Sequence, residues 1–205
     1  MWCRFIALAA MSALAGILAN GTANALSLGY SRGANAAVDR MQFDAPTLGP
    51  FAYARFCVQY PEDCKVHRMA FRGGRFALDD QRRKDLVTIN AEVNRSIKPE
   101  RNLEGVAGER WLISPRSGDC NDYAVTKRHD LLALGWPSRA LLLAEVVTTW
   151  GEHHLVVVVR AKEGDLVIDN LNANIRPWLK TQYRWVRVQS PQDPIMWSTV
   201  AKATG

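Results

Sequence analysis

The hydrophobic pattern of residues 79–97 is that of an amphipathic helix. Apolar side chains recur at three- and four-residue spacing among charged ones, at Leu86, Ile89, Val93 and Ile97. This spacing places all four on one face, so we expect a helix over residues 79–97 with that face buried. Pro99 ends it, because proline lacks the backbone N–H that another turn would need.

A second helix is expected over residues 120–134, with Cys120 in its first turn. Asp119 is a natural N-cap, Asp122 adds acid to the first turn, and Gly135 marks the end. The N-terminal end of a helix carries positive potential, which lowers the pKa of a thiol placed there from its usual value of about 8.5. The position of Cys120 therefore favours a nucleophile over a packing residue.

Beyond residue 139 the pattern changes from helical to extended. Apolar runs separated by short polar turns predict strands over residues 140–148, 153–160, 166–169 and 183–188. The short connections predict an antiparallel meander, with the last run as its fourth strand. The fold class expected from these elements is α+β, with helices packed on an antiparallel sheet.

Two polar positions interrupt this apolar sheet. His153 and His154 open the second predicted strand, and Asp169 closes the third. Adjacent antiparallel strands lie about 4.8 Å apart, so a histidine on one and a carboxylate on the next can meet. A thiol nucleophile needs a nearby base, and the base needs a third group that fixes its tautomer, so these residues and Cys120 form a candidate triad. On spacing alone, a strand edge followed by a turn explains them equally well.

The N-terminus predicts export. Arg4 precedes an acid-free apolar run of about 14 residues, and Ala23 and Ala25 form an Ala-x-Ala cleavage site. We therefore expect residues 1–25 to be a signal peptide and the mature protein to be periplasmic or secreted, with no later membrane span. An uncleaved anchor or an N-terminal core helix is the alternative. Residues 26–50, rich in Gly, Ala, Ser and Pro, predict an irregular lead-in to one domain over residues 51–205.

Export also changes the cysteine count. Cys3 leaves with the signal peptide, and three cysteines remain. In an oxidising compartment Cys57 and Cys64 can close a small loop, worth about 2.5 kcal/mol. Cys120 is then the odd thiol, and an odd cysteine in a secreted protein is an intermolecular crosslink, a buried inert residue or a reactive group.

Charge limits the class of partner. The whole chain carries a formal net charge of +6, which becomes about +5 once Arg4 is removed with the signal peptide. This mild excess suits work near anionic envelope material or on an acidic substrate. The basic residues are scattered along the chain, and together with export this argues against a nucleic-acid partner.

Three segments in this order resemble the bacterial transglutaminase-like cysteine proteinases. They are Gly-Asp-Cys-x-Asp-Tyr-Ala around Cys120, His-Leu-Val from His154, and Ile-Asp-Asn-Leu around Asp169. The resemblance covers roughly residues 50–200 and includes Trp111, the Cys57 to Cys64 element and the Tyr-x-Trp motif from Tyr183. It implies a papain-like or transglutaminase-like fold with a Cys120, His154 and Asp169 triad, in which His153 points to the opposite face of its strand.

The resemblance also implies a function. The best-understood members of the family are periplasmic proteases that cut large surface adhesins and so release bacteria from biofilms. It therefore implies a protein substrate in the periplasm or on the cell surface and an inner-membrane regulatory protein. Two alternatives remain open, which are transglutaminase-type acyl transfer to an amine and a non-catalytic binding or regulatory module that keeps the fold. Backbone N–H groups at the start of the Cys120 helix would stabilise the oxyanion, because they lack intrahelical partners.

One position departs from the family pattern. Adhesin-cleaving members resemble Gly-Asp-Cys-Glu-Asp, with acids on both sides of the nucleophile contributing to a calcium site, whereas Asn121 stands here. Asp119 and Asn121 still offer oxygen atoms, but the lost charge weakens any calcium site they form. We therefore expect no required cofactor and weak calcium binding at most.

Overall fold

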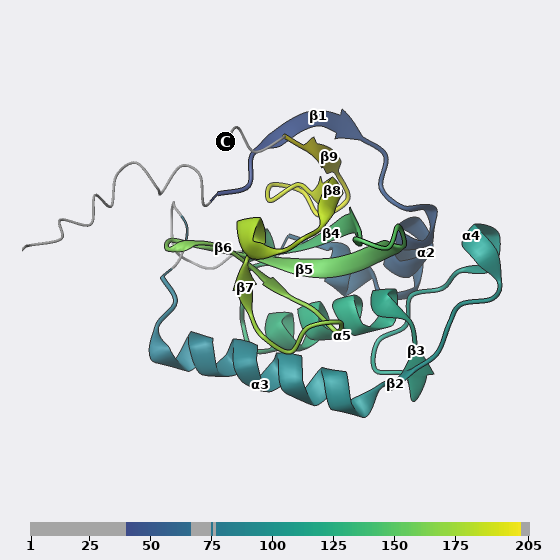
Figure 1. Ribbon diagram of the computed structural model, residues 1–205, viewed down its shortest axis with the longest axis horizontal. Helices are drawn as coiled ribbons and strands as arrows, with labels where there is room; N and C mark the ends of the chain where they lie inside the picture. The colour runs from purple at the N-terminus through teal and green to yellow at the C-terminus, as the bar shows by residue number, and fades with distance from the viewer. Residues whose placement is uncertain (1–39, 67–74, 76, 202–205) are drawn as a thin grey trace, which may run out of the picture. The chain divides into compact units, whose positions relative to one another are not determined.

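The computed structural model describes residues 40–66, 75 and 77–201, shown in Figure 1. The predicted signal peptide, residues 1–25, lies outside the described residues. The helices are α2 (Phe51–Gln59), α3 (Asp80–Ser96), α4 (Gly105–Gly108), α5 (Cys120–Ala133) and the 3-10 turns η1 (Pro61–Cys64), η2 (Ser138–Ala140) and η3 (Trp178–Lys180). The strands are β1 (Phe43–Thr47), β2 (Lys98–Pro99), β3 (Ser117–Gly118), β4 (Leu141–Val147), β5 (His153–Ala161), β6 (Gly164–Ile168), β7 (Arg176–Pro177), β8 (Arg184–Gln189) and β9 (Trp197–Val200).

Within the described residues, seven strands form one sheet in the order β1-β9-β8-β4-β5-β6-β7. The antiparallel meander β4-β5-β6 is confirmed. The fourth predicted strand, β8, is not the next strand of that meander, because it pairs with β4 on the opposite side. The free edge of β6 is taken instead by the short strand β7, so the chain crosses to the other side of the sheet before β8 begins.

The expected irregular lead-in over residues 26–50 is wrong for residues 43–47. These residues form β1, an edge strand that pairs antiparallel with β9. The strand is mostly exposed and contains Pro46, which an edge position tolerates because its outer N–H needs no partner. Residues 43–47 lack apolar alternation and so carry no strand signal, and their pairing with residues near the C-terminus makes them a strand.

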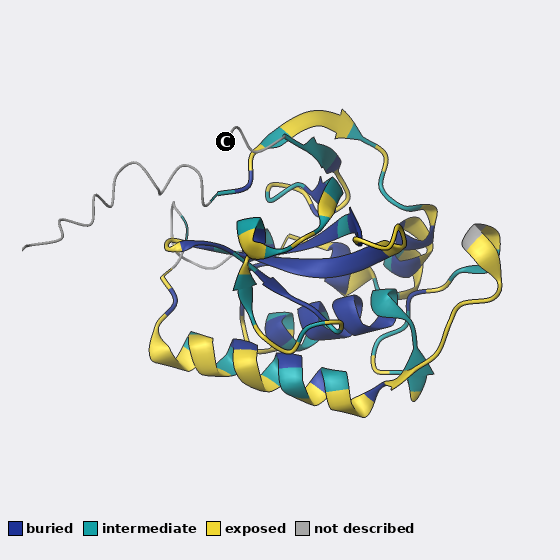
Figure 2. Cartoon of the chain, in the orientation of Figure 1, coloured by how far each residue is buried: buried dark blue, intermediate teal, exposed yellow. Residues whose placement is uncertain are grey.

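Both faces of the sheet are buried, and α5 covers one of them. Val157, Val159 and Leu155 of β5 pack in the same core cluster as Val125 and Leu131 of α5. The long helix α3 lies on the far side of α5 (Figure 1), so α5 is buried while the outer side of α3 is exposed (Figure 2). Burial from both sides explains why α5 has no simple apolar stripe, whereas α3 does.

The other face of the sheet is covered without a long helix. Its core cluster includes Val156 and Val158 of β5 together with Val146 of β4 and Trp178 of η3. His154 lies on this face, because it alternates with Leu155 along β5. The two faces therefore present the two adjacent histidines to different surroundings.

The predicted ends of both helices are confirmed. Asp79 caps α3 by accepting a hydrogen bond from the Arg82 N–H (2.8 Å). Helix α5 begins at Cys120 with Asp119 as its N-cap and ends before Gly135, which has a φ of +82°. Glycine adopts this left-handed conformation without steric cost, which is why it stops the helix here.

The proposed pairing of Cys57 with Cys64 is confirmed. The two residues form a disulfide with a Cα–Cα distance of 5.6 Å, joining α2 to η1. Cys120 is the free cysteine of the described part of the chain. The Cys120 thiol therefore takes no part in a structural crosslink within these residues.

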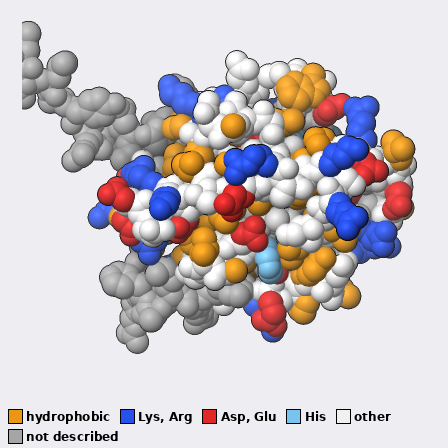
Figure 3. Space-filling view, turned by 90° about the horizontal axis from the view of Figure 1, so that it is seen from below, with side chains coloured by type: hydrophobic (Ala, Val, Ile, Leu, Met, Phe, Trp, Pro, Cys, Tyr) orange, Lys and Arg blue, Asp and Glu red, His pale blue; other side chains and the backbone are white. Residues whose placement is uncertain are grey.

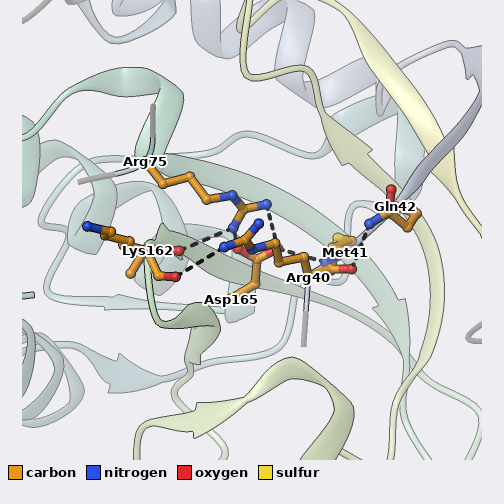
Figure 4. Close-up of polar contacts among 7 residues, drawn as sticks. Arg40, Met41, Gln42, Arg75, Lys162 and Asp165 are labelled. Carbon is orange, nitrogen blue, oxygen red and sulfur yellow. Dashed lines mark hydrogen bonds and ion pairs between the residues drawn. The ribbon is translucent and has the colours of Figure 1, made fainter. Parts of the chain in front are cut away.

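A buried carboxylate fixes the approach to β1. Asp165 of β6 is almost fully buried, accepts a hydrogen bond from the Met41 N–H (2.7 Å) and forms an ion pair with Arg75 (Figure 4). Arg40 donates to the Lys162 carbonyl beside it (3.4 Å). Asp165 thus joins the start of the described chain, at Met41, to the start of β6. Breaking its buried ion pair with Arg75 would leave an uncompensated charge.

The surface charge pattern agrees with the expectation from the sequence that basic residues are scattered. On the face seen in Figure 3, basic and acidic side chains are interspersed. No helix in the described ranges combines the length and the apolar character needed to cross a bilayer.

Candidate active site

The start of α5 is held in place by its own acids. The Asp119 carboxylate accepts from the Asn121 N–H (2.9 Å), and Asp122 accepts from the Asp119 N–H (3.0 Å), which completes a capping box. Asp122 also accepts from the Leu112 N–H (2.7 Å). A Cβ at Gly118 would collide with the Asp122 carboxylate, so close packing favours glycine at this position. Cys120 is thus fixed at the first position of the helix.

The structure brings His154 and Asp169 into direct contact. His154 Nε2 lies 2.7 Å from Asp169 Oδ1, and the two side chains are only 4% and 3% exposed. Burial alone raises the pKa of Asp169, but the hydrogen bonds from His154, Tyr183 and the Leu171 N–H outweigh it and hold that pKa below its usual value. Asp169 is therefore ionised and fixes the proton on Nε2, which leaves Nδ1 as the basic nitrogen of the ring.

Cys120 lies in the same cleft as His154. The cleft has a volume of about 930 Å³, and the half-buried thiol and the imidazole both line it. Its outer wall carries exposed apolar side chains, namely Leu103, Trp150 and Leu171. A cleft of this size, with apolar walls and a few polar groups, suits an extended peptide segment.

The expected effect of the helix start on the thiol is wrong in sign. Burial, followed by the negative charge of Asp119, raises the pKa of Cys120 to about 12, although a hydrogen bond from the Leu155 N–H lowers it. Desolvation and the flanking acids thus raise the pKa that the helix start was expected to lower. The resting thiol is therefore protonated at neutral pH, so proton removal by a neighbouring base is essential for any nucleophilic role.

His153 faces away from His154. Its side chain is 70% exposed, and Nδ1 pairs with Glu145 Oε1 (2.5 Å). Glu145 in turn accepts from Arg187 Nε. This arrangement matches the strand alternation expected from the sequence, and it gives His153 a surface contact with Glu145 instead of a contact with Asp169.

The sequence model of the bacterial transglutaminase-like cysteine proteinases matches residues 44–204. The chain belongs to this family. It is therefore a cysteine peptidase, as the resemblance implied. No curated protein matches the chain.

Solved structures support the fold of this cysteine proteinase. Calcium-bound LapG of Legionella pneumophila superposes with a TM-score of 0.50 and 21% sequence identity, covering 60% of this chain and 72% of that one. EGTA-treated LapG of the same organism gives a TM-score of 0.48 and 22% identity, covering 58% and 68%. The α+β, transglutaminase-like fold class is confirmed by the family match together with the calcium-bound LapG structure.

The calcium-bound relative raises the question of whether this cysteine proteinase can hold calcium beside its nucleophile. The Asp119 carboxylate accepts from a backbone N–H, and Asn121 donates its amide to Glu109 Oε1 (2.5 Å). Glu109 also accepts from Trp111 Nε1 (2.9 Å). In the described part of the chain, no three His, Cys, Asp or Glu side chains are grouped to share a metal ion. In this arrangement the Asp119 and Glu109 carboxylates accept hydrogen bonds from N–H donors.

Sequence reasoning gave no role to Tyr183. The structure places its hydroxyl against Asp169 Oδ2, to which it donates a hydrogen bond. Tyr183 belongs to the Tyr-x-Trp motif, but the motif alone does not say what the tyrosine contacts. Only the position of β8 beside β4 brings it to the histidine and the aspartate.

Proposed function

We propose that this chain is an exported cysteine protease that hydrolyses a peptide bond in a cell-surface or envelope protein, such as an adhesin. Cys120 is the nucleophile, His154 the base and Asp169 the residue that orients the base. The observation that carries the proposal is the contact of 2.7 Å between His154 Nε2 and Asp169 Oδ1, beside a free cysteine in one cleft. The family match supports the same reaction class.

In the mechanism, the proton of Cys120 Sγ moves to His154 Nδ1 as sulfur attacks the substrate carbonyl carbon. Asp169 stabilises the imidazolium that forms. The tetrahedral intermediate then expels the amine, which takes the proton from His154, and a thioester remains. Water, deprotonated by His154, hydrolyses the thioester and restores the thiol.

The oxyanion is held at the start of α5. The Asn121 N–H already donates to Asp119, and the Asp119 N–H donates to Asp122. No hydrogen bond among the described residues uses the Cys120 N–H, which therefore stands as the donor for the oxyanion. A donor fixed by a capping box needs no reorganisation when negative charge develops.

Export is supported by the predicted signal peptide and by the disulfide between Cys57 and Cys64. Such bonds persist in oxidising compartments, which include the bacterial periplasm. Both features fit an enzyme that meets its substrate outside the cytoplasm.

Comparison of cell-surface proteins tests this function. In cells that carry the wild-type enzyme, we expect a large surface protein to lose a fragment that appears in the medium. Cells with Cys120→Ala should retain the intact protein, because no acyl-enzyme forms. Mass spectrometry of the medium and of the surface fraction measures both. Crosslinked surface proteins in place of fragments would indicate acyl transfer, and identical samples would contradict catalysis at this site.

We further propose that activity does not depend on calcium. Chelation with EGTA should leave most activity intact, and calorimetry should detect no calcium binding tighter than the micromolar range. Asn121→Glu supplies the missing carboxylate and should strengthen calcium binding at least about tenfold, since affinity follows the ligand charge. Sub-micromolar binding by the wild-type protein, with activity lost in EGTA, would contradict this proposal.

A further inference from the structure

Tyr183 contacts both the histidine and the aspartate of the site from a distant part of the sheet. Its hydroxyl donates to Asp169 Oδ2, and its ring centroid lies 5.7 Å from that of the His154 imidazole. The residue directly precedes β8, which is separated from β5 by β4. Val146 of β4 pairs with His154 on one side and with Trp185 on the other. The tyrosine side chain therefore reaches across β4 to the triad.

The hydrogen bonds of Asp169 show what this contact does. Oδ1 accepts from His154 Nε2 (2.7 Å) and from the Leu171 N–H (3.0 Å). Of the hydrogen bonds recorded for the described residues, the one from Tyr183 is the bond that fixes Oδ2. Rotation of a carboxylate about its last torsion meets only a broad, two-fold energy profile. A partner on the second oxygen therefore sets the plane of the carboxylate, and with it the direction in which Oδ1 holds the imidazole.

We propose that Tyr183 is a positioning residue of the triad, whose hydroxyl locks the Asp169 carboxylate and whose ring packs against His154 so that Nδ1 faces Cys120. The inference rests on the proposed function and deepens it. Tyr183 is not among the residues that line the cleft, so it acts through Asp169 and His154 and not on the substrate.

The electrostatics support this role. Burial, followed by the hydrogen bond to Asp169, raises the pKa of Tyr183 far above neutral, so the hydroxyl remains a donor at every working pH. The same hydrogen bond helps to keep the pKa of Asp169 low. Without the hydroxyl that pKa rises, and Asp169 becomes protonated at a higher pH as the solution is acidified. His154 then loses the charge that stabilises its imidazolium.

Other ionisable groups also face this pair. Lys127 of α5 is buried, and burial lowers its pKa to about 7 while Asp169 raises it. Arg176 of β7 faces Tyr183, and Cys120 senses the charge of Asp169. Removal of the Tyr183 hydroxyl leaves all three in place. A ratio of variant to wild type at each pH therefore isolates the effect of the hydroxyl.

Alkylation of Cys120 by iodoacetamide tests the proposal, because His154 must take the thiol proton as sulfur attacks the reagent. The mature full-length protein is titrated from pH 4 to pH 9, and mass spectrometry follows the Cys120 peptide. Tyr183→Phe should react about tenfold more slowly at pH 6, equivalent to roughly one pKa unit, and its acid limb should move to higher pH. Tyr60→Phe is the matched control, since its hydroxyl contacts Gln59 and not the triad. It should react as the wild type does.

Two reference variants distinguish a wrong triad from a wrong role for Tyr183. If Asp169→Asn and His154→Ala react as fast as the wild type, the triad itself is wrong. If both are slow while Tyr183→Phe matches Tyr60→Phe in rate and pH profile, the positioning role of Tyr183 is overturned. In the Asp169→Asn background, Tyr183→Phe should have no further effect, and an additional slowing of equal size would show that Tyr183 acts by another route. Thermal unfolding of each variant checks that the fold is retained.

Discussion

Cys120→Ala is expected to abolish turnover and to leave the fold intact. The substitution removes the sulfur that forms the thioester, and the enzyme has no second free cysteine within the described residues. The cap of α5 should survive, because it is built from Asp119 and Asp122 and not from the thiol. We expect the rate to fall at least roughly 10⁴-fold, as it does when a nucleophile is removed from comparable triads.

The measurement is cleavage of the surface protein identified by fragment release, with purified wild-type and variant enzyme. Thermal unfolding should give midpoints within a few degrees of each other, since the half-buried thiol contributes little packing area. Cleavage by Cys120→Ala at even one tenth of the wild-type rate would remove Cys120 as nucleophile. A wild-type Cys120 that reacts with a thiol probe no faster than Cys120 of the His154→Ala variant would favour the non-catalytic binding module.

The sequence predicted well those features that depend on neighbours along the chain. The start of α5 follows from a local signal, the aspartate at its N-cap, and the ends of α3 and α5 follow from a proline and a glycine. The meander β4-β5-β6 also follows, because short turns join consecutive strands. The pairing of β1 with β9 joins residues about 150 positions apart and has no local signal. The place of β8 beside β4 could not be predicted for the same reason.

The sequence proposed the residues of the site but not its electrostatics. The family resemblance pointed to Cys120, His154 and Asp169, and the structure places the last two in contact. The pKa of the thiol came out with the wrong sign, because a helix start was considered without the burial and the Asp119 charge that surround it. Both are tertiary features. Tyr183 was missed on the same ground, since its contact with Asp169 depends on the order of strands in the sheet.

The raised pKa of Cys120 makes the base more important than a sequence-based estimate would suggest. A thiolate already formed by a helix dipole could react without help from a histidine. A thiol with a pKa of about 12 stays protonated through the neutral range, so a base must take its proton as the bond to substrate forms. The choice between the two histidines therefore has large kinetic consequences.

His154→Ala is expected to lower the rate roughly 10⁴-fold, whereas His153→Ala should stay within about threefold of the wild type. His154 is buried against Asp169, while the His153 side chain is 70% exposed and paired with Glu145. Loss of His154 leaves Cys120 protonated and the departing amine without a proton donor. Loss of His153 removes one surface contact with Glu145, and such an exposed contact contributes less than about 1 kcal/mol.

The two variants form a matched pair, because they remove the same side chain from adjacent residues of one strand. Cleavage rates of both are compared with that of Asp169→Asn, which should also fall by orders of magnitude, since an amide no longer enforces the proton on Nε2. Inactive His153→Ala together with active His154→Ala would mean that β5 is shifted by one residue relative to β4, which reverses the face of every side chain on the strand. Such a shift would exchange the side chains of the run Leu155 to Val159 between the two faces of the sheet, each of which is packed in its own core cluster. The cost of repacking both clusters is the physical reason to expect His154, and not His153, beside Asp169.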